Sequence, residues 1–159
     1  MSSGDWTCLI FIILLFTHVE SQLEEDIFVS NLTPGCMKCL CAASSGCPLQ
    51  PLGCDSGYCG PFQISKAYWM DAVKGTPLAT TDDKVFQDCV NVYKCASQVV
   101  TYYIARYARD CNKDGVVTCE DFLMINHNGG YECEKPLDRN PVGIGYLRRY
   151  MNCTENPIS

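Results

Sequence analysis

The sequence predicts a small α+β domain that is mainly helical, with a short β-hairpin region and about six disulfides. Three observations lead to this prediction. The chain has 13 cysteines in 159 residues, and six of them fall within positions 36–59. Apolar residues recur every three or four positions over residues 85–107, which is the spacing of one helix face. Residues 48–58 are rich in proline and glycine, as turns around short strands are.

The N-terminus is predicted to be a signal peptide. Residues 9–16 form an apolar run, and the small residues Val19 and Ser21 fit the pattern that precedes a signal-peptidase site. Cleavage after Ser21 would remove residues 1–21 and release a secreted, extracellular protein with no membrane association. An uncleaved membrane anchor is the alternative, and it is disfavoured because a span needs about 20 apolar residues. No later stretch is long and apolar enough to cross a membrane.

Twelve cysteines remain after this cleavage, and an even number in a secreted chain indicates six disulfides. They are Cys36, Cys39, Cys41, Cys47, Cys54, Cys59, Cys89, Cys95, Cys111, Cys119, Cys133 and Cys153. A zinc site at Cys36 and Cys39 is disfavoured, because the remaining chain has a single histidine and the secretory route is oxidising.

One folded domain is expected, because a mature chain of about 138 residues is long enough for one core. Residues 22–35 are predicted to be an N-terminal arm, residues 36–153 the domain, and residues 154–159 a C-terminal tail. The net charge is −6 and no basic patch is present, so nucleic acid is not an expected partner.

The first elements of the domain follow from local signals. A helix is expected over residues 36–43, ending at Ser44, Ser45 and Gly46. A strand is expected over residues 62–64. A second helix over residues 65–73 would bury Tyr68 and Trp69.

The later helices follow from apolar spacing. The stripe over residues 85–107 predicts either one long helix, capped by Thr81, or two helices broken near residues 94–95. A last helix is expected over residues 141–153. It would turn Ile144, Leu147 and Met151 inward and Arg148 and Arg149 outward.

Residues 110–121 match the template of a calcium-binding loop. The template residues are Asp110, Asn112 and Asp114 at positions one, three and five, Gly115 at six, Val116 at seven, Val117 at eight and Asp121 at twelve. Position twelve is usually Glu, whose longer side chain reaches further. No cofactor is expected to be required, and structural Ca²⁺ is the hypothesis for this loop. The alternative is a turn rich in Asn, Asp and Gly between two helices. A disulfide between Cys111 and Cys119 would close the loop with or without metal.

Several motifs spread along the domain resemble those of the invertebrate-type lysozymes, the family that includes destabilase. They are Cys36-x-x-Cys39-x-Cys41, Ser45-Gly46-Cys47, Cys59-Gly60-Pro61-Phe62-Gln63-Ile64, Tyr68-Trp69-x-Asp71, His127-Asn128-Gly129-Gly130 and Gly145-Tyr146. The resemblance implies a lysozyme-like fold. It also implies a glycoside hydrolase that cuts the β-1,4 bonds of bacterial peptidoglycan, in antibacterial defence or digestion.

Glycoside hydrolysis needs two carboxyl groups, one of which must donate a proton to the leaving oxygen. In active members of the family that acid is a Glu directly before Ser-Gly-Cys, and here the position is Ser44. A serine hydroxyl is far too weak an acid for this role. Asp55 is the only carboxylate in the segment 54–59, where the family places the second one.

Two functions from different classes therefore stay open. The first is a secreted lysozyme-type glycosidase. The second is a non-catalytic lectin-like or regulatory protein that binds peptidoglycan or a chitin-like polysaccharide. Loss of a general acid typically costs about 10²–10⁴-fold in rate, which favours the second function. The candidate sugar-contacting residues are Tyr58, Phe62, Tyr68, Trp69 and His127.

Overall fold

The structure, a computed structural model, describes residues 29–156, so the predicted signal peptide lies outside the described residues. Within that part of the chain there are six α-helices: α2 (Pro34–Ser45), α3 (Lys66–Val73), α4 (Asp83–Val90), α5 (Tyr93–Tyr107), α6 (Cys119–Asn128) and α7 (Pro141–Glu155). A short 3₁₀ helix, η1 (Leu137–Arg139), precedes α7. The prediction of a mainly helical α+β domain is confirmed.

The short β-hairpin region is a three-stranded antiparallel sheet of β1 (Cys54–Asp55), β2 (Tyr58–Cys59) and β3 (Ile64–Ser65). Cys54 pairs with Cys59 in the hairpin, and Cys59 pairs with Ile64 on its other side. The strand predicted over residues 62–64 begins only at Ile64. Phe62 lies in the preceding turn, where it is buried.

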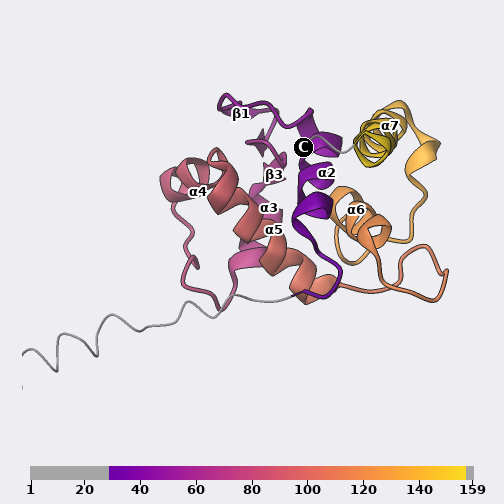
Figure 1. The fold of residues 1–159 in the computed structure, drawn as a ribbon. Coiled ribbons are helices and arrows are strands. Elements are labelled where there is room, and N and C mark those ends of the chain that lie inside the picture. The colour runs from indigo at the N-terminus through magenta and orange to yellow at the C-terminus, as the bar shows by residue number, and fades with distance from the viewer. Residues whose placement is uncertain (1–28, 157–159) are drawn as a thin grey trace, which may run out of the picture.

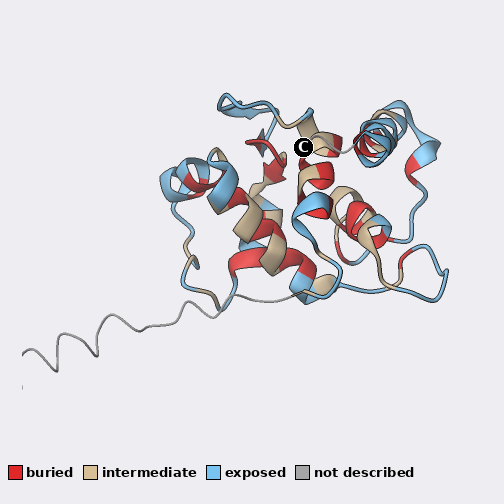
Figure 2. Ribbon diagram, viewed as in Figure 1, coloured by how far each residue is buried: buried red, intermediate tan, exposed pale blue. Residues whose placement is uncertain are grey.

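The helices gather around α2. Figure 1 shows α3, α4 and α5 on one side of α2, and α6 and α7 on the other. The closest packing of α2 is against α7 and α6, while α5 packs against α3 and α4. Buried residues line the facing sides of these helices in Figure 2, and Leu40, Trp69 and Phe122 are fully enclosed.

Helix α2 is longer than predicted at both ends. Its start is set by Thr33, whose Oγ1 accepts a hydrogen bond from the Cys36 amide at 3.1 Å, and by Pro34 in the first turn. Its end comes at Gly46, which has φ +83°, the left-handed conformation that glycine adopts most easily. Ser44 and Ser45 therefore belong to the last turn of the helix.

The long apolar stripe forms two helices, and the break lies at residues 91–92, three residues before the predicted position. The Cys89–Cys95 disulfide spans this break. Asp82, rather than Thr81, caps α4. Its Oδ1 accepts hydrogen bonds from the amides of Lys84 at 2.7 Å and Val85 at 3.1 Å.

Helix α7 is rotated relative to the prediction. Ile144 and Met151 are 46% and 49% exposed, and the buried face carries Gly143, Tyr146, Tyr150 and Cys153. Both sets of residues have helical spacing, so periodicity alone does not choose between them. The choice is made by tertiary contacts, because the Cys39–Cys153 disulfide ties this face to α2. Arg148 and Arg149 are exposed, as predicted.

All twelve domain cysteines are paired, which confirms six disulfides. The pairs are Cys36–Cys119, Cys39–Cys153, Cys41–Cys47, Cys54–Cys59, Cys89–Cys95 and Cys111–Cys133. The two long-range pairs from α2 reach α6 and α7. Over residues 29–156, no helix has the length and apolar character needed to span a membrane.

Candidate functional site

Ser44 occupies the last turn of α2 and is half-buried between α6 and α7. Its hydroxyl donates a hydrogen bond to the Leu40 carbonyl at 2.9 Å. The same oxygen accepts a hydrogen bond from Asn126 Nδ2 at 3.3 Å. The Ser44 hydroxyl is thus engaged both as a donor and as an acceptor.

Asn126 of α6 connects Ser44 to two tyrosines. Its Nδ2 donates to the Tyr146 hydroxyl at 2.8 Å, and its Oδ1 accepts from the Tyr68 hydroxyl at 3.1 Å. Burial raises the pKa of both tyrosines above the ordinary value, so both are neutral at pH 7. We call Ser44, Tyr68, Asn126 and Tyr146 the Ser44 network. It joins α2, α3, α6 and α7 through uncharged groups alone.

Arg149 of α7 is a charged side chain that hydrogen-bonds to the backbone of this region. Arg149 Nε donates to the Ala43 carbonyl at 2.7 Å, and Arg149 Nη2 donates to the Ser44 carbonyl at 3.4 Å. These bonds satisfy carbonyls at the end of α2, where a cation is favoured by the helix dipole. No carboxylate of residues 29–156 hydrogen-bonds to the Ser44 network.

Asp55 lies in β1 of the hairpin, where it is exposed and pairs with Tyr58. Its carboxylate accepts a hydrogen bond from the neighbouring Ser56 hydroxyl at 3.1 Å. Figure 1 shows β1 at the edge of the molecule, at a distance from α6 and α7. Asp55 and Ser44 are therefore not joined by a hydrogen bond.

The predicted sugar-contacting aromatics fall into different environments. Phe62 and Trp69 are 2% and 0% exposed, so neither ring has a free face for a sugar. Trp69 Nε1 donates to the Thr80 carbonyl at 3.1 Å, and its ring meets Phe86 edge-on. These two rings belong to the core. Tyr58, in the hairpin, is 52% exposed.

Tyr68 and His127 are half-buried. The Tyr68 ring stacks on Tyr103 with centroids 3.7 Å apart. The His127 ring lies 4.7 Å from the Tyr146 ring, and its Nδ1 is 2.9 Å from Asn128 Oδ1. Tyr68 thus belongs to the Ser44 network, and His127 borders it through the Tyr146 ring.

A row of tyrosines that the motifs did not indicate continues from Tyr68. Tyr103, Tyr107 and Tyr131 follow with successive ring centroids 4.7 Å and 5.2 Å apart, and Tyr131 is 78% exposed. Gly130 packs directly on Tyr107, where a Cβ would lie 2.1 Å from the ring, and its amide donates to the Tyr103 hydroxyl at 3.0 Å. The periodicity assigned Tyr103 and Tyr107 to a core stripe. Only this close approach of Gly130 links them to the His-Asn-Gly-Gly motif.

The predicted calcium loop is held by its own backbone. Asp121 is fully buried, and its oxygens accept hydrogen bonds from the amides of Cys111 at 2.7 Å and Thr118 at 2.7 Å. Asp110 accepts from the amides of Lys113 at 2.7 Å and Gly115 at 2.9 Å. The carboxylates are therefore turned to N–H groups rather than toward a shared centre.

Calcium binding by this loop stays a prediction. Over residues 29–156, no group of three or more His, Cys, Asp or Glu side chains is placed to hold a metal. Cys111 and Cys119 pair with Cys133 and Cys36 rather than with each other, so no disulfide closes the loop on itself. The Asp121 carboxylate forms a capping box with Thr118 at the start of α6.

The fold is similar to the crystal structure of Meretrix lusoria lysozyme in complex with Aeromonas hydrophila PliI. The TM-score is 0.57 at 28% identity, over 83% of this chain and 100% of that chain. It is also similar to Tapes japonica lysozyme, with a TM-score of 0.53 at 29% identity, over 77% of this chain and 92% of that chain.

The destabilase family matches residues 33–154. The chain therefore belongs to the destabilase family of invertebrate-type lysozymes. It is 33% identical to invertebrate-type lysozyme 2 of Caenorhabditis elegans, over 85% of this chain and 96% of that protein. It is 37% identical to lysozyme 1 of Crassostrea virginica, over 82% of this chain but only 65% of that protein.

Proposed function

We propose that this protein is a secreted polysaccharide-binding member of the invertebrate-type lysozyme family that lacks muramidase activity. Its ligand would be bacterial peptidoglycan or a chitin-like polysaccharide. The observation that supports the proposal best is the Ser44 network, in which uncharged, hydrogen-bonded groups surround the position where the family resemblance predicts the general acid.

The absence of muramidase activity is proposed because of the chemistry of position 44. A general acid must hold a proton near neutral pH and release it to the leaving oxygen. The proton of Ser44 is donated to the Leu40 carbonyl, and the surrounding tyrosines hold theirs more tightly because they are buried. Without an acid, the rate of glycoside cleavage would fall by about 10²–10⁴-fold.

Polysaccharide binding requires fewer specific chemical groups than catalysis does. Exposed aromatic rings stack on sugar rings, and such stacking requires no titratable group. Tyr58 on the hairpin and Tyr131 at the end of the tyrosine row are both more than half exposed. We expect these two rings to carry most of the contact with sugar.

Glycoside hydrolysis is the second candidate, and family membership favours it. The relatives from Meretrix lusoria and Crassostrea virginica are named lysozymes, and Asp55 is an exposed carboxylate on the hairpin. A protein active in antibacterial defence or digestion would then need another group to act as the acid.

A peptidoglycan turbidity assay separates the two candidates. We expect no clearing by the natural protein and none by Ser44→Gln. Ser44→Glu differs from that control only in carrying an acid, and we expect it to clear at least about 10²-fold faster. Robust clearing by the natural protein would overturn the proposal of an inactive enzyme.

Co-sedimentation with insoluble peptidoglycan and with chitin tests the binding function. We expect the natural protein in at least one pellet, and a reduced amount of Tyr58→Ala and of Tyr131→Ala. Val142→Ala removes an exposed apolar side chain that is not aromatic from α7 and should bind normally. Absence of the natural protein from both pellets would reject the proposal.

A further inference from the structure

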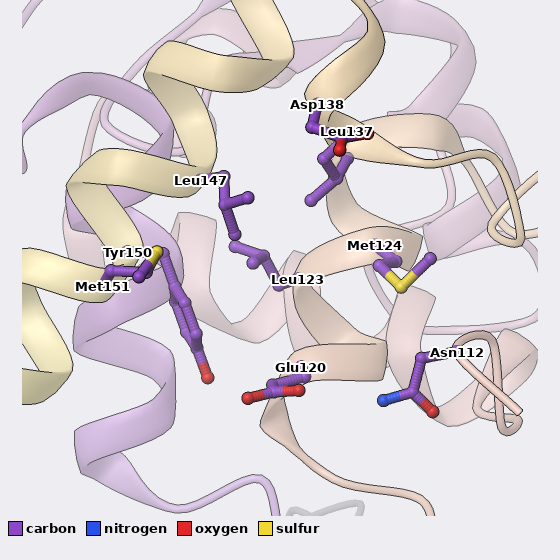
Figure 3. A pocket seen from close by; sticks show the side chains of 9 residues that line it. All are labelled: Asn112, Glu120, Leu123, Met124, Leu137, Asp138, Leu147, Tyr150 and Met151. Carbon is purple, nitrogen blue, oxygen red and sulfur yellow. The ribbon is translucent and has the colours of Figure 1, made fainter. Parts of the chain in front are cut away.

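A concave site lies between α6, η1 and α7, and none of the side chains of the Ser44 network lines it (Figure 3). We call it the groove. Its volume is about 290 Å³, near the lower end of the range for small-molecule pockets. The walls are apolar and include Leu137, Leu147, Met124 and Met151. These include two residues, Leu147 and Met151, that the sequence predicted to point into the core.

Tyr150 is the buried polar group of this groove. It is 6% exposed, and its hydroxyl makes no hydrogen bond within residues 29–156. Figure 3 shows the hydroxyl turned toward the Glu120 carboxylate. Burial, and then the negative charge of Glu120, raise the pKa of Tyr150 to about 12, so the hydroxyl keeps its proton. The ring is buried but the hydroxyl oxygen is not enclosed, so it is free to bond a ligand in the groove.

The charge of the groove is negative. Glu120 and Asp138 line it, and neither is in an ion pair with a residue of the described chain. No lysine, arginine or histidine is among the lining residues. An anionic amphiphile such as a fatty acid would therefore be repelled, whereas an apolar group that carries a positive charge would be attracted.

We propose that this groove binds an aliphatic ammonium group. The ammonium N–H groups would donate to the Glu120 carboxylate and to the Tyr150 oxygen. The alkyl chain would lie along Leu147, Met124 and Met151. The site goes beyond the proposed polysaccharide-binding function and does not depend on it, because it lies on other side chains.

Methyl NMR of the full-length secreted protein, labelled at the methionine methyl groups, tests this site with hexylamine as the probe. We expect saturable shifts of the Met124 and Met151 methyl signals. Met37, which is buried in α2, and Met70, which is exposed on α3, report on other regions and should not shift. Hexan-1-ol has the same chain without the charge and should bind about fivefold more weakly, as expected for one partly exposed ion pair.

Three variants locate the ammonium group. Glu120→Gln should weaken hexylamine binding about fivefold and leave hexan-1-ol binding unchanged. Asp138→Asn removes the same charge from another part of the groove and should change binding less than about twofold. Tyr150→Phe keeps the ring and should weaken hexylamine binding by about three- to tenfold.

Three outcomes would overturn the proposal. Equal affinity for hexylamine and hexan-1-ol would leave only an apolar groove. Equal losses of hexylamine affinity in Glu120→Gln and Asp138→Asn would show that the ammonium group is not bound specifically at Glu120 and Tyr150. Shifts of Met37 and Met70 alongside the groove signals would indicate non-specific association.

Discussion

Asn126 is the residue on which the region around position 44 depends. Its side-chain amide bonds Tyr68, Tyr146 and Ser44, which come from three other helices. All of these groups are partly or fully removed from water. When one of their hydrogen bonds is lost, the remaining partner is left desolvated and unpaired. Serine at position 44 fits this network because it is small and can both donate and accept.

Replacing Asn126 with Ala should therefore destabilise the fold. We expect the free energy of unfolding to fall by about 2–3 kcal/mol, because the Tyr68 and Tyr146 hydroxyls lose their partner. Urea denaturation with the disulfides intact measures this. Asn152→Ala, at an exposed position of α7, should change it by less than about 0.5 kcal/mol. Equal values for the two variants would show that the network contributes nothing to stability.

At the scale of an element, α7 shows how one helix can carry two apolar faces. One face packs on α2 and η1, and the other lines the groove of Figure 3. Gly143 sets the first face close to η1, since a Cβ there would lie 2.0 Å from the Leu137 carbonyl oxygen. A Cβ on Gly145, two residues later, would meet no atom outside its own stretch of helix backbone nearer than Arg149 Nη1 at 3.5 Å.

The two glycines of α7 should respond oppositely to alanine. Gly143→Ala forces α7 away from η1 and should lower the free energy of unfolding by about 1–3 kcal/mol. Gly145→Ala gains helix propensity in open space and should raise it by up to about 1 kcal/mol. Thermal and urea unfolding of both variants give the comparison. A Gly143→Ala protein as stable as Gly145→Ala would contradict the close approach.

For the whole molecule, the disulfides and the buried tyrosines hold the helices together. Cys36–Cys119 and Cys39–Cys153 link α2 to α6 and α7 across 83 and 114 residues. Cys41–Cys47, Cys54–Cys59 and Cys89–Cys95 close short loops instead. Long loops cost the unfolded chain more entropy when they are closed, so the long-range pairs should stabilise most.

Removing the Cys39–Cys153 pair with two alanines should lower the free energy of unfolding by about 5 kcal/mol in the chain-entropy account. Removing Cys54–Cys59 in the same way should lower it by about 2 kcal/mol, because the loop is short. Chemical unfolding of the two double variants measures the difference. A larger loss from the short hairpin pair would contradict this ranking.

We expect the protein to lose stability at high pH because the pKa values of its buried tyrosines are raised. Below about pH 10 the folded and unfolded states both keep these protons, so stability does not depend on them. Burial raises the pKa of Tyr68, Tyr103 and Tyr146 in the folded state and that of Tyr150 to about 12. Above about pH 10 the unfolded chain releases protons that the folded chain retains, so the free energy of unfolding should fall as pH rises.

Tyrosinate absorbance and urea unfolding between neutral and alkaline pH check this prediction. Tyr150→Phe removes one of the raised groups and should make the fall in stability shallower. The prediction fails if all tyrosines titrate together at their ordinary pKa and Tyr150→Phe has the same pH dependence as the natural protein.

The sequence by itself determined the family, the mainly helical class and the number of disulfides, because cysteine spacing and motif residues are local signals. It also predicts that Ser44 stands where the family carries its acid, and this prediction rests on the spacing to Cys41 and Cys47. Helix starts were less accurate, because an Asp82 carboxylate and a Thr33 hydroxyl compete with their neighbours for the cap.

Only the tertiary structure decided what surrounds those residues. Which face of α7 is buried depends on a disulfide 114 residues away in sequence and on the contact of Gly143 with η1. Ser44 is bonded by side chains of α6 and α7 as well as by the Leu40 carbonyl of its own helix, and Asp121 accepts hydrogen bonds from backbone amides. Spacing along one chain segment determines the residues that share a face, whereas the packing of distant segments determines what that face meets.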